Sequence, residues 1–130
     1  MTIEEVIDRY FSYLNADDFV SFRELWHEDA DFKAVGARPL SGVDDIVAFY
    51  SRLFTPWPRH VDEPVRIIVA GGTATVEVVF TGTTEDGRDV TFDAVDVFDV
   101  DAGRIRRLTN WYDIAYVRRQ LAAPEPARGA

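Results

Sequence analysis

Three aspartates stand in a segment whose other residues are typical of a β-strand. Residues 91–100 read TFDAVDVFDV and contain Asp93, Asp96 and Asp99, although strands disfavour aspartate. Because side chains alternate between the two faces of a strand, Asp93 and Asp99 share a mixed face that can meet water. Asp96 falls on the other face, with the apolar residues Phe92, Ala94 and Phe98. A carboxyl group buried in this way has a raised pKa, so it can act as an acid or a base near neutral pH.

Two tyrosines are the next candidates for chemistry. Tyr10 and Tyr50 each fall on the apolar stripe of a predicted helix, and a buried phenol without a hydrogen-bond partner costs roughly 1–3 kcal/mol. Each tyrosine therefore needs a polar neighbour, and Asp96 has the same need. Two interpretations stay open: a catalytic cluster, or core tyrosines with satisfied hydroxyls and Asp96 as a structural acceptor for Tyr10 or Asn110.

The last predicted strand contributes a further polar group. Over residues 104–112, alternation places Leu108, Asn110 and Tyr112 on one face. The other face then holds Ile105, Arg107, Thr109 and Trp111. We assign the first set to the interior because it buries no charge.

The elements that must position these side chains begin with helices. The Thr2–Glu5 capping box, followed by an apolar stripe, predicts a helix over about 3–15. Asp17 can cap a second, shorter helix that carries Phe19, Phe22, Leu25 and Trp26. A third helix, with Ser41 as its predicted cap, buries Val43, Ile46, Val47, Tyr50, Leu53 and Phe54.

Strands make up most of the remainder. One short strand is predicted between the second and third helices, and an antiparallel series joined by glycine turns follows the third helix. The predicted strands cover residues 30–35, 65–69, 75–80, 91–100 and 104–112, and a closing helical turn covers 115–121. The chain is thus an α+β protein with a cone-shaped, curved antiparallel sheet wrapped around N-terminal helices. It forms one domain, 1–121, with a polar C-terminal tail, 122–130, and the concave side of the sheet can hold a ligand.

Composition excludes several classes of function. The net charge of −9 disfavours nucleic acid, whose phosphates would be repelled. The chain has no cysteine, which excludes disulfides and thiolate metal sites, and the few acidic and histidine candidates do not converge into a metal site. No apolar run is long enough to cross a membrane and the N-terminal residues do not resemble a secretory signal, so we expect a cytoplasmic protein.

The order of elements resembles that of the ketosteroid isomerases. The resemblance covers residues 3–118 and depends on Tyr10, on GVDDIVAFY ending at Tyr50, and on FDAVDVFDVDAGRI containing Asp96. These enzymes belong to the nuclear-transport-factor-two-like superfamily, of cystatin-like fold, with SnoaL-like polyketide cyclases and scytalone dehydratase. The resemblance implies that Tyr10 and a protonated Asp96 donate hydrogen bonds to a substrate carbonyl as it becomes an enolate, that Tyr50 supports Tyr10, and that no cofactor is needed.

One part of the isomerase pattern is missing. The position of the family's general base carries Ala34, and neither neighbour is a carboxylate. The segment RHVDEPV resembles that of SnoaL-like and dehydratase relatives in which a histidine enters the cavity, which makes His60 the alternative base. Limonene epoxide hydrolases share the fold, but Glu77, Val79 and Asn110 stand where their Asp-Arg-Asp constellation would be, so we reject that activity.

The sequence therefore predicts a cofactor-independent proton-transfer enzyme acting on a hydrophobic carbonyl compound such as a steroid or polyketide. Isomerisation, aldol-type cyclisation and dehydration would all use the same groups. The predicted catalytic residues are Tyr10, Asp96 and His60, and the predicted substrate-binding residues are Tyr50, Asn110, Tyr112, Trp26, Phe92 and Ala34. The alternative is a non-catalytic binding module with the same pocket, which Ala34 favours. With either function we expect a homodimer formed through the outer sheet face, which carries Val95, Val97 and Trp111.

Overall fold

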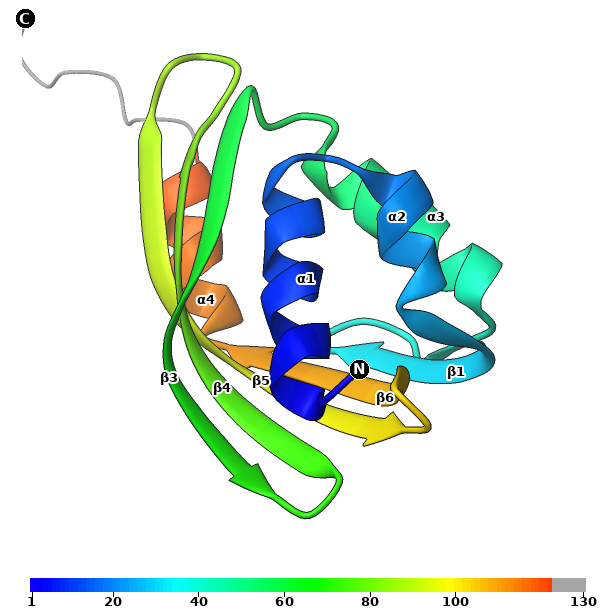
Figure 1. Cartoon of the computed structure of the whole chain (residues 1–130). Coiled ribbons are helices and arrows are strands. Elements are labelled where there is room, and N and C mark those ends of the chain that lie inside the picture. The colour runs from blue at the N-terminus through cyan, green and yellow to red at the C-terminus, as the bar shows by residue number, and fades with distance from the viewer. Residues whose placement is uncertain (123–130) are drawn as a thin grey trace, which may run out of the picture.

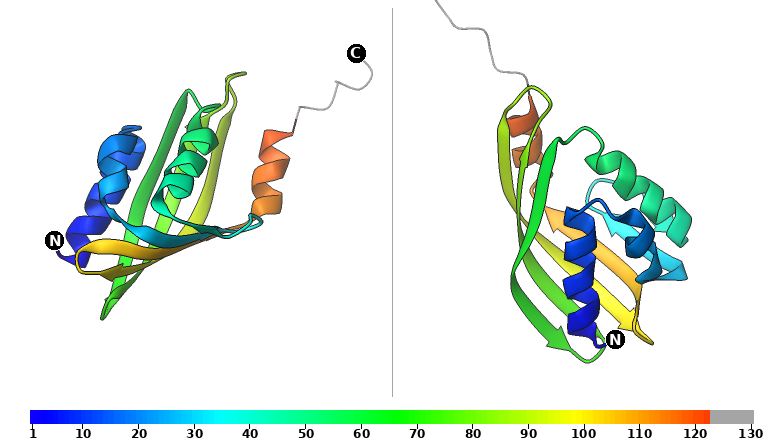
Figure 2. Two further views of the ribbon diagram at one scale, coloured as in Figure 1. Left: turned by 90° about the vertical axis from the view of Figure 1, so that its right-hand side faces the viewer. Right: turned by 45° about the horizontal axis from the view of Figure 1, so that its top comes forward.

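A computed structural model describes residues 1–122, so most of the predicted tail lies outside the described residues. A curved sheet carries α1–α3 on its concave side, and α4 stands apart from them (Figures 1 and 2). The helices are α1 (Ile3–Asn15), α2 (Phe19–Glu24), α3 (Val43–Phe54) and α4 (Ile114–Leu121). The strands are β1 (Trp26–Ala34), β2 (Leu40–Ser41), β3 (Arg59–Ala70), β4 (Thr73–Thr83), β5 (Asp89–Asp101) and β6 (Arg104–Tyr112). The α+β fold with a curved sheet is as predicted.

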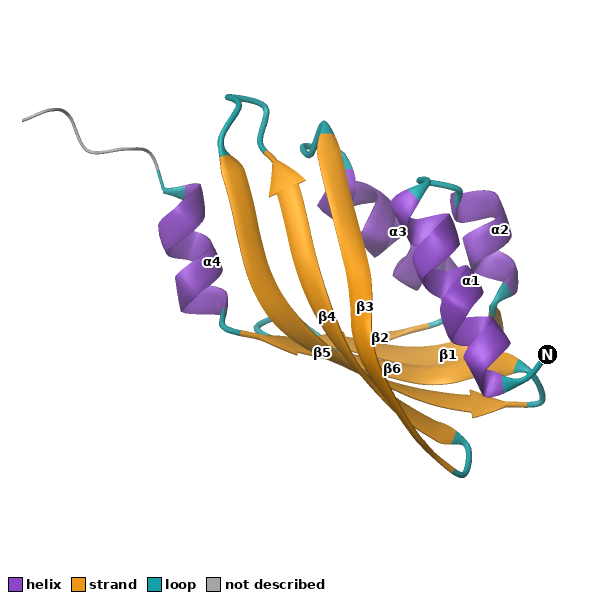
Figure 3. Ribbon diagram, turned by 60° about the vertical axis from the view of Figure 1, so that its left-hand side comes forward, coloured by secondary structure: helices purple, strands orange, loops and turns teal. Residues whose placement is uncertain are grey.

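The sheet has the strand order β2-β1-β6-β5-β4-β3. Every pair is antiparallel except β1 with β6, which is parallel. The first long strand, β1, therefore pairs with the last strand, β6, while α1 packs against α2 and β3. The strands β3, β4 and β5 are long and bent, so they rise from the β1–β6 layer and close the concave side (Figure 3). No helix in the described part of the chain is long and apolar enough to span a membrane.

The first helix forms as predicted, at both ends. Thr2 caps α1 by accepting a hydrogen bond from the backbone N–H of Glu5, which satisfies one of the unpaired donors at a helix start. The helix buries one stripe, made of Val6, Ile7, Tyr10, Phe11 and Leu14. The apolar spacing in the sequence was sufficient here because it matches the helical repeat throughout.

The caps of the next two helices differ from the prediction. Asp18, not Asp17, caps α2, and Asp17 has a positive φ of 55° in the turn before it. Trp26 does not lie on this helix but is the first residue of β1. Gly42 precedes α3 without any side-chain cap, because the hydroxyl of Ser41 donates instead to the carboxylate of Asp31.

Alternation along the strands is correct for β5 and partly wrong for β6. Asp96 is buried with Ala94 and Phe98 as expected. On β6, Leu108 is buried, but so is Ile105, which was assigned to the outer face. The β5–β6 register shifts after Asp99, and such an irregularity inserts a residue and reverses the alternation on one side of it. A strict period of two cannot detect this shift.

Candidate active site

A partly open cavity of about 180 Å³ lies on the concave side of the sheet. Its residues come from every helix except α2 and every strand except β2, so only the complete fold creates it. The partly exposed Leu53 of α3 and Leu121 of α4 line it from opposite sides. The lining residues are Tyr10, Leu14, Phe32, Ala34, Phe49, Tyr50, Leu53, Phe54, Trp57, Asp62, Val78, Phe80, Phe92, Ala94, Asp96, Asn110, Tyr112, Val117 and Leu121. Apolar side chains therefore surround a small number of polar groups, as is typical of ligand pockets.

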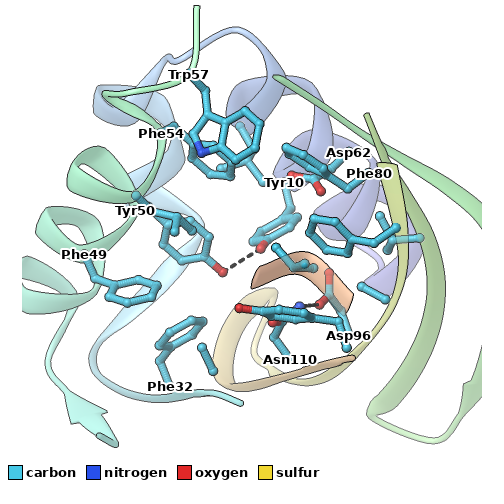
Figure 4. Close-up of a pocket in the computed structure, with 18 of the residues that line it drawn as sticks. Tyr10, Phe32, Phe49, Tyr50, Phe54, Trp57, Asp62, Phe80, Asp96 and Asn110 are labelled. Carbon is cyan, nitrogen blue, oxygen red and sulfur yellow. Dashed lines mark hydrogen bonds between the residues drawn. The ribbon is translucent and has the colours of Figure 1, made fainter. Parts of the chain in front are cut away.

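The two tyrosine hydroxyls meet in this cavity (Figure 4). The oxygens of Tyr10 and Tyr50 lie 2.6 Å apart, which is the supporting hydrogen bond that the resemblance implied. Burial raises the pKa of both phenols well above their ordinary value, so both remain protonated. One of the two protons forms the bond between the oxygens, and the other is available to a ligand.

Asp96 lies on the β5 side of the same cavity as the tyrosine pair and is 5% exposed. Asn110, its partner in the β5–β6 register, donates a hydrogen bond from its amide nitrogen to one carboxyl oxygen at 2.6 Å. Burial raises the pKa of Asp96 to about 6, and the Asn110 bond partly offsets this. The direction agrees with the expectation. The resemblance implies a protonated Asp96, whereas the bond donated by Asn110 favours its ionised form.

A second carboxyl group in the cavity, Asp62 of β3, was missed in the sequence. Its side chain lines the cavity on the same side as Asp96 and Phe80 in Figure 4. No side-chain hydrogen bond stabilises its ionised form in the described structure. Burial, and to a smaller extent the charge of Asp96, raises its pKa to about 7. The sequence contained a pattern that could have identified Asp62: it is two residues from His60, so alternation along a strand places both on the same face.

Asn15 fixes the backbone of Asp62. Its amide nitrogen donates to the carbonyl oxygen of Asp62 at 2.9 Å, and its amide oxygen accepts from the Asp62 N–H at 2.8 Å. Since β3 is an edge strand, these two bonds replace those of a missing neighbouring strand. Asn15 is the last residue of α1, so the helix that carries Tyr10 is tied directly to the strand that carries Asp62.

We expect Asn15→Ala to destabilise the protein by about 1–3 kcal/mol, because it leaves two partly buried backbone groups of Asp62 without a partner. Urea denaturation would measure the loss in the free energy of unfolding. Ser12→Ala, at an exposed position of the same helix, is the control and should change little. Equal effects of the two substitutions would contradict the role of Asn15.

His60 does not line the cavity, which corrects the prediction that it enters it. The residue is 6% exposed, and its ring stacks on Phe54, with the ring centroids 4.2 Å apart. Its Nε2 lies 2.7 Å from a carboxylate oxygen of Asp17. Phe54 lines the cavity, so His60 lies behind that wall, and its hydrogen bond with Asp17 links β3 to the turn after α1. The geometry does not support His60 as the general base.

Trp26 is also outside the cavity. It is 1% exposed and packs against Tyr10 and Tyr50, with ring centroids 6.4 Å and 6.3 Å away. It therefore supports the tyrosine pair without contacting a ligand. The other predicted binding residues, Tyr50, Ala34, Asn110, Phe92 and Tyr112, all line the cavity.

Four aromatic rings form a continuous row along the cavity wall. Trp57 contacts Phe80 at a centroid distance of 5.2 Å, Phe80 stacks on Phe92 at 4.7 Å, and Phe92 meets Tyr112 at 5.1 Å. A flat ring can stack on such a surface, and a cation can lie over it. In the part of the chain that the structure describes, no group of three or more potential ligands could hold a metal ion.

The comparisons with known proteins agree with this fold. The SnoaL-like domain family matches residues 7–108, and the chain belongs to this family. A Jannaschia protein described as a SnoaL-like polyketide cyclase is 21% identical, with a TM-score of 0.85 over 93% of this chain and 92% of the other. No curated protein matches the sequence.

Two other solved structures show how widely the fold is used. An epoxide hydrolase-like protein of Mycobacterium tuberculosis is 20% identical, with a TM-score of 0.77 over 90% and 86% of the two chains. TerC, crystallised with polyporic acid, is 17% identical, with a TM-score of 0.81 over 90% and 95%. At these identities the likeness establishes a ketosteroid isomerase-like, nuclear-transport-factor-two-like fold and no particular activity.

Proposed function

We propose that the protein catalyses cofactor-independent proton transfer at a carbon next to the carbonyl group of a compact hydrophobic molecule. The observation that carries this proposal is the presence of two carboxyl groups with raised pKa values, Asp62 and Asp96, in one apolar cavity that also holds the Tyr10–Tyr50 pair. Family membership favours an aldol-type cyclisation or a related isomerisation over other uses of this chemistry.

The environments of the two carboxyl groups suggest separate roles. Asp96 accepts a bond from Asn110, which stabilises its ionised form, so it is the general base. Asp62 has no such donor and keeps its proton to a higher pH, so it is the general acid. Environments that move two pKa values apart are how one site performs both tasks. The spare proton of the tyrosine pair would donate to the substrate oxygen as negative charge develops there.

The cavity limits the size of the substrate. A cavity of about 150 Å³ holds one benzene molecule, and this one is about 180 Å³. One or two rings can be enclosed, whereas a four-ring steroid would extend past Leu53 and Leu121. We therefore propose a small aromatic or polyketide-like carbonyl compound rather than a whole steroid.

Deuterium exchange into 2-tetralone tests the proposal. The protein in D₂O should exchange the acidic protons next to the carbonyl faster than buffer alone, as measured by proton NMR. Asp93→Asn, on the exposed side of the same strand as Asp96, is the control and should match the unchanged protein. An exchange rate equal to that of buffer alone would contradict the proposed proton-transfer function.

The alternative remains a binding module, because Ala34 occupies the position of the family's base and lies opposite Asn110 in the β1–β6 register. The same experiment separates the two. Binding of 2-tetralone, seen as broadened ligand signals, without any exchange would indicate a pocket that holds its ligand unchanged. An epoxide hydrolase gains no support, since Glu77 and Val79 face away from the cavity and no arginine lines it among the described residues.

We also propose that two copies pair through the outer sheet face. This face carries Trp111, which is 48% exposed, and the partly exposed Val95 and Val97. The outer groove beside them contains both apolar and acidic residues, and Arg107 lies on the same strand as Trp111. Apolar surface mixed with both signs of charge can be complementary to its own copy.

Trp111→Glu should shift the protein from dimer to monomer, because it places a charge at the centre of this face. Size-exclusion chromatography with light scattering measures the mass. Val20→Glu is the control, since Val20 is 81% exposed on α2, away from the sheet. A monomeric unchanged protein would refute the pairing outright.

A further inference from the structure

The cavity has an uneven charge. The two carboxyl groups Asp62 and Asp96 line it, and no lysine, arginine or histidine does so among the described residues. Asp96 is 5% exposed, and in the described structure one of its oxygens accepts a hydrogen bond, from the amide of Asn110. The other oxygen, and the whole Asp62 carboxyl, have no hydrogen-bond donor in the described structure. The site therefore has acceptor capacity that the protein itself does not use.

We propose that this pocket binds compact arylalkyl amines in their protonated form, with the ammonium group against Asp62 and Asp96 and the ring on the aromatic row that contains Trp57 and Phe80. An ammonium group donates up to three hydrogen bonds, which fits the unused carboxyl oxygens. The low-dielectric walls strengthen its attraction to a carboxylate. The row of ring faces adds a further favourable surface for the cation.

The same charge distribution excludes acidic ligands. A ligand carboxylate would stand in an apolar cavity beside an ionised Asp96, with no basic side chain to compensate it. By contrast, the proposed proton transfer keeps the charge constant, because Asp96 becomes neutral as the substrate oxygen becomes negative. The inference rests on the proposed function only for the site being open to small molecules, and it adds that the natural substrate carries no carboxylate.

The pH dependence has a defined origin. Between about pH 5.5 and pH 8 only the two aspartates change charge in the cavity, because burial raises the pKa of the phenols further above that range. The titratable groups facing the site are Tyr10 from α1, Tyr50 from α3, Asp62 from β3, Asp96 from β5 and Tyr112 from β6. Of the neighbours outside the lining, His60 is paired with Asp17 and Arg118 lies near Tyr112. Ionisation of Asp62 and Asp96 with rising pH should therefore strengthen the binding of a cation.

Three ligands of one shape test the proposal: benzylamine, benzyl alcohol and benzoate, titrated into the full-length protein by calorimetry. Benzylamine stays protonated at both pH values, and its affinity should rise about ten-fold from about pH 5.5 to pH 8. The affinity for benzyl alcohol should change less than about two-fold over the same pH range, because a neutral ligand has no net charge to interact with the ionised carboxylates. Benzoate should not bind at pH 8. Near neutral pH, binding of benzylamine should release a proton from the protein. This release is detected as a difference in the measured heat of binding between two buffers of different ionisation enthalpy.

Variants connect the effect to the two carboxyl groups. Asp62→Asn should remove most of the proton release, and Asp93→Asn should leave it intact, because Asp93 lies on the outer face. The proposal is overturned if benzylamine binds no more tightly than benzyl alcohol at pH 8. It is also overturned if benzoate binds as tightly as benzylamine, or if benzylamine does not bind. Deuterium exchange into 2-tetralone is measured separately. A protein that catalyses this exchange but shows no preference for a cationic ligand would refute only this inference.

Discussion

Asp96→Asn is expected to lower the rate of deuterium exchange into 2-tetralone by about 10²–10⁴-fold, the usual contribution of a general base. The substitution keeps the size of the side chain and a hydrogen-bonding group opposite Asn110, so the cavity should keep its shape. The loss should therefore appear in kcat rather than in KM. Proton NMR measures the exchange, and thermal unfolding checks that the variant is folded.

The pH profile of the unchanged protein provides a second readout. Activity should rise as Asp96 ionises around pH 6 and fall as Asp62 loses its proton around pH 7. The two groups interact, so the limbs report the pair rather than either residue alone. A narrow bell-shaped profile is expected, and Asp96→Asn should remove it. Asp96→Asn with full activity would show that the base lies elsewhere.

Asp62→Asn is expected to stabilise the protein by about 2–4 kcal/mol at pH 8 and to change little near pH 4. Its pKa in the folded protein is about 7, against an ordinary value of 3.8 for an aspartate in the unfolded chain. Between these two values the folded protein holds the proton while the unfolded chain releases it. Stability is therefore lost as the pH rises through that window, and asparagine removes this loss. Because Asp62 is only partly buried, solvent makes this loss of stability smaller than the full pKa shift would give.

Urea denaturation at the two pH values measures this difference. Glu63→Gln is the matched control, because Glu63 is the next residue along β3 and is exposed. The stabilised variant should also lose exchange activity, since it lacks the proposed acid. Such a gain of stability with a loss of activity is typical of a functional site. An Asp62→Asn variant whose stability changes equally at both pH values would show that the carboxyl is not held in the cavity as described.

Much of the site could be predicted from local patterns. Tyr10 and Tyr50 were found because they fall on helical stripes, and both are buried where those stripes predict. Asp96 and Asn110 were found because side chains alternate along strands, and the two are register partners. These periods belong to the backbone geometry of single elements, so one sequence is enough to reveal them.

The site residues whose positions were not predicted correctly share a different cause. Asp62 lies two residues before Pro64, after which the register of β3 with β4 shifts, and the short strand predicted from 65 to 69 did not include it. Trp26 was assigned to a helix, because an apolar residue at the end of an amphipathic segment also fits the start of a strand. His60 shares the face of Asp62 but lies behind Phe54, and no local pattern distinguishes a residue that lines a cavity from one behind its wall.

The sequence by itself determined the three main helices, the succession of strands, and a lone acid on an apolar face. Only the tertiary structure decided that Asp62 joins Asp96, because the curvature of the sheet brings an edge strand and a central strand to the same hollow. The raised pKa values have the same origin, since the burial that shifts them comes from side chains on distant elements. Local periodicity fixes which way a side chain points, whereas its neighbours and their dielectric are fixed by long-range packing.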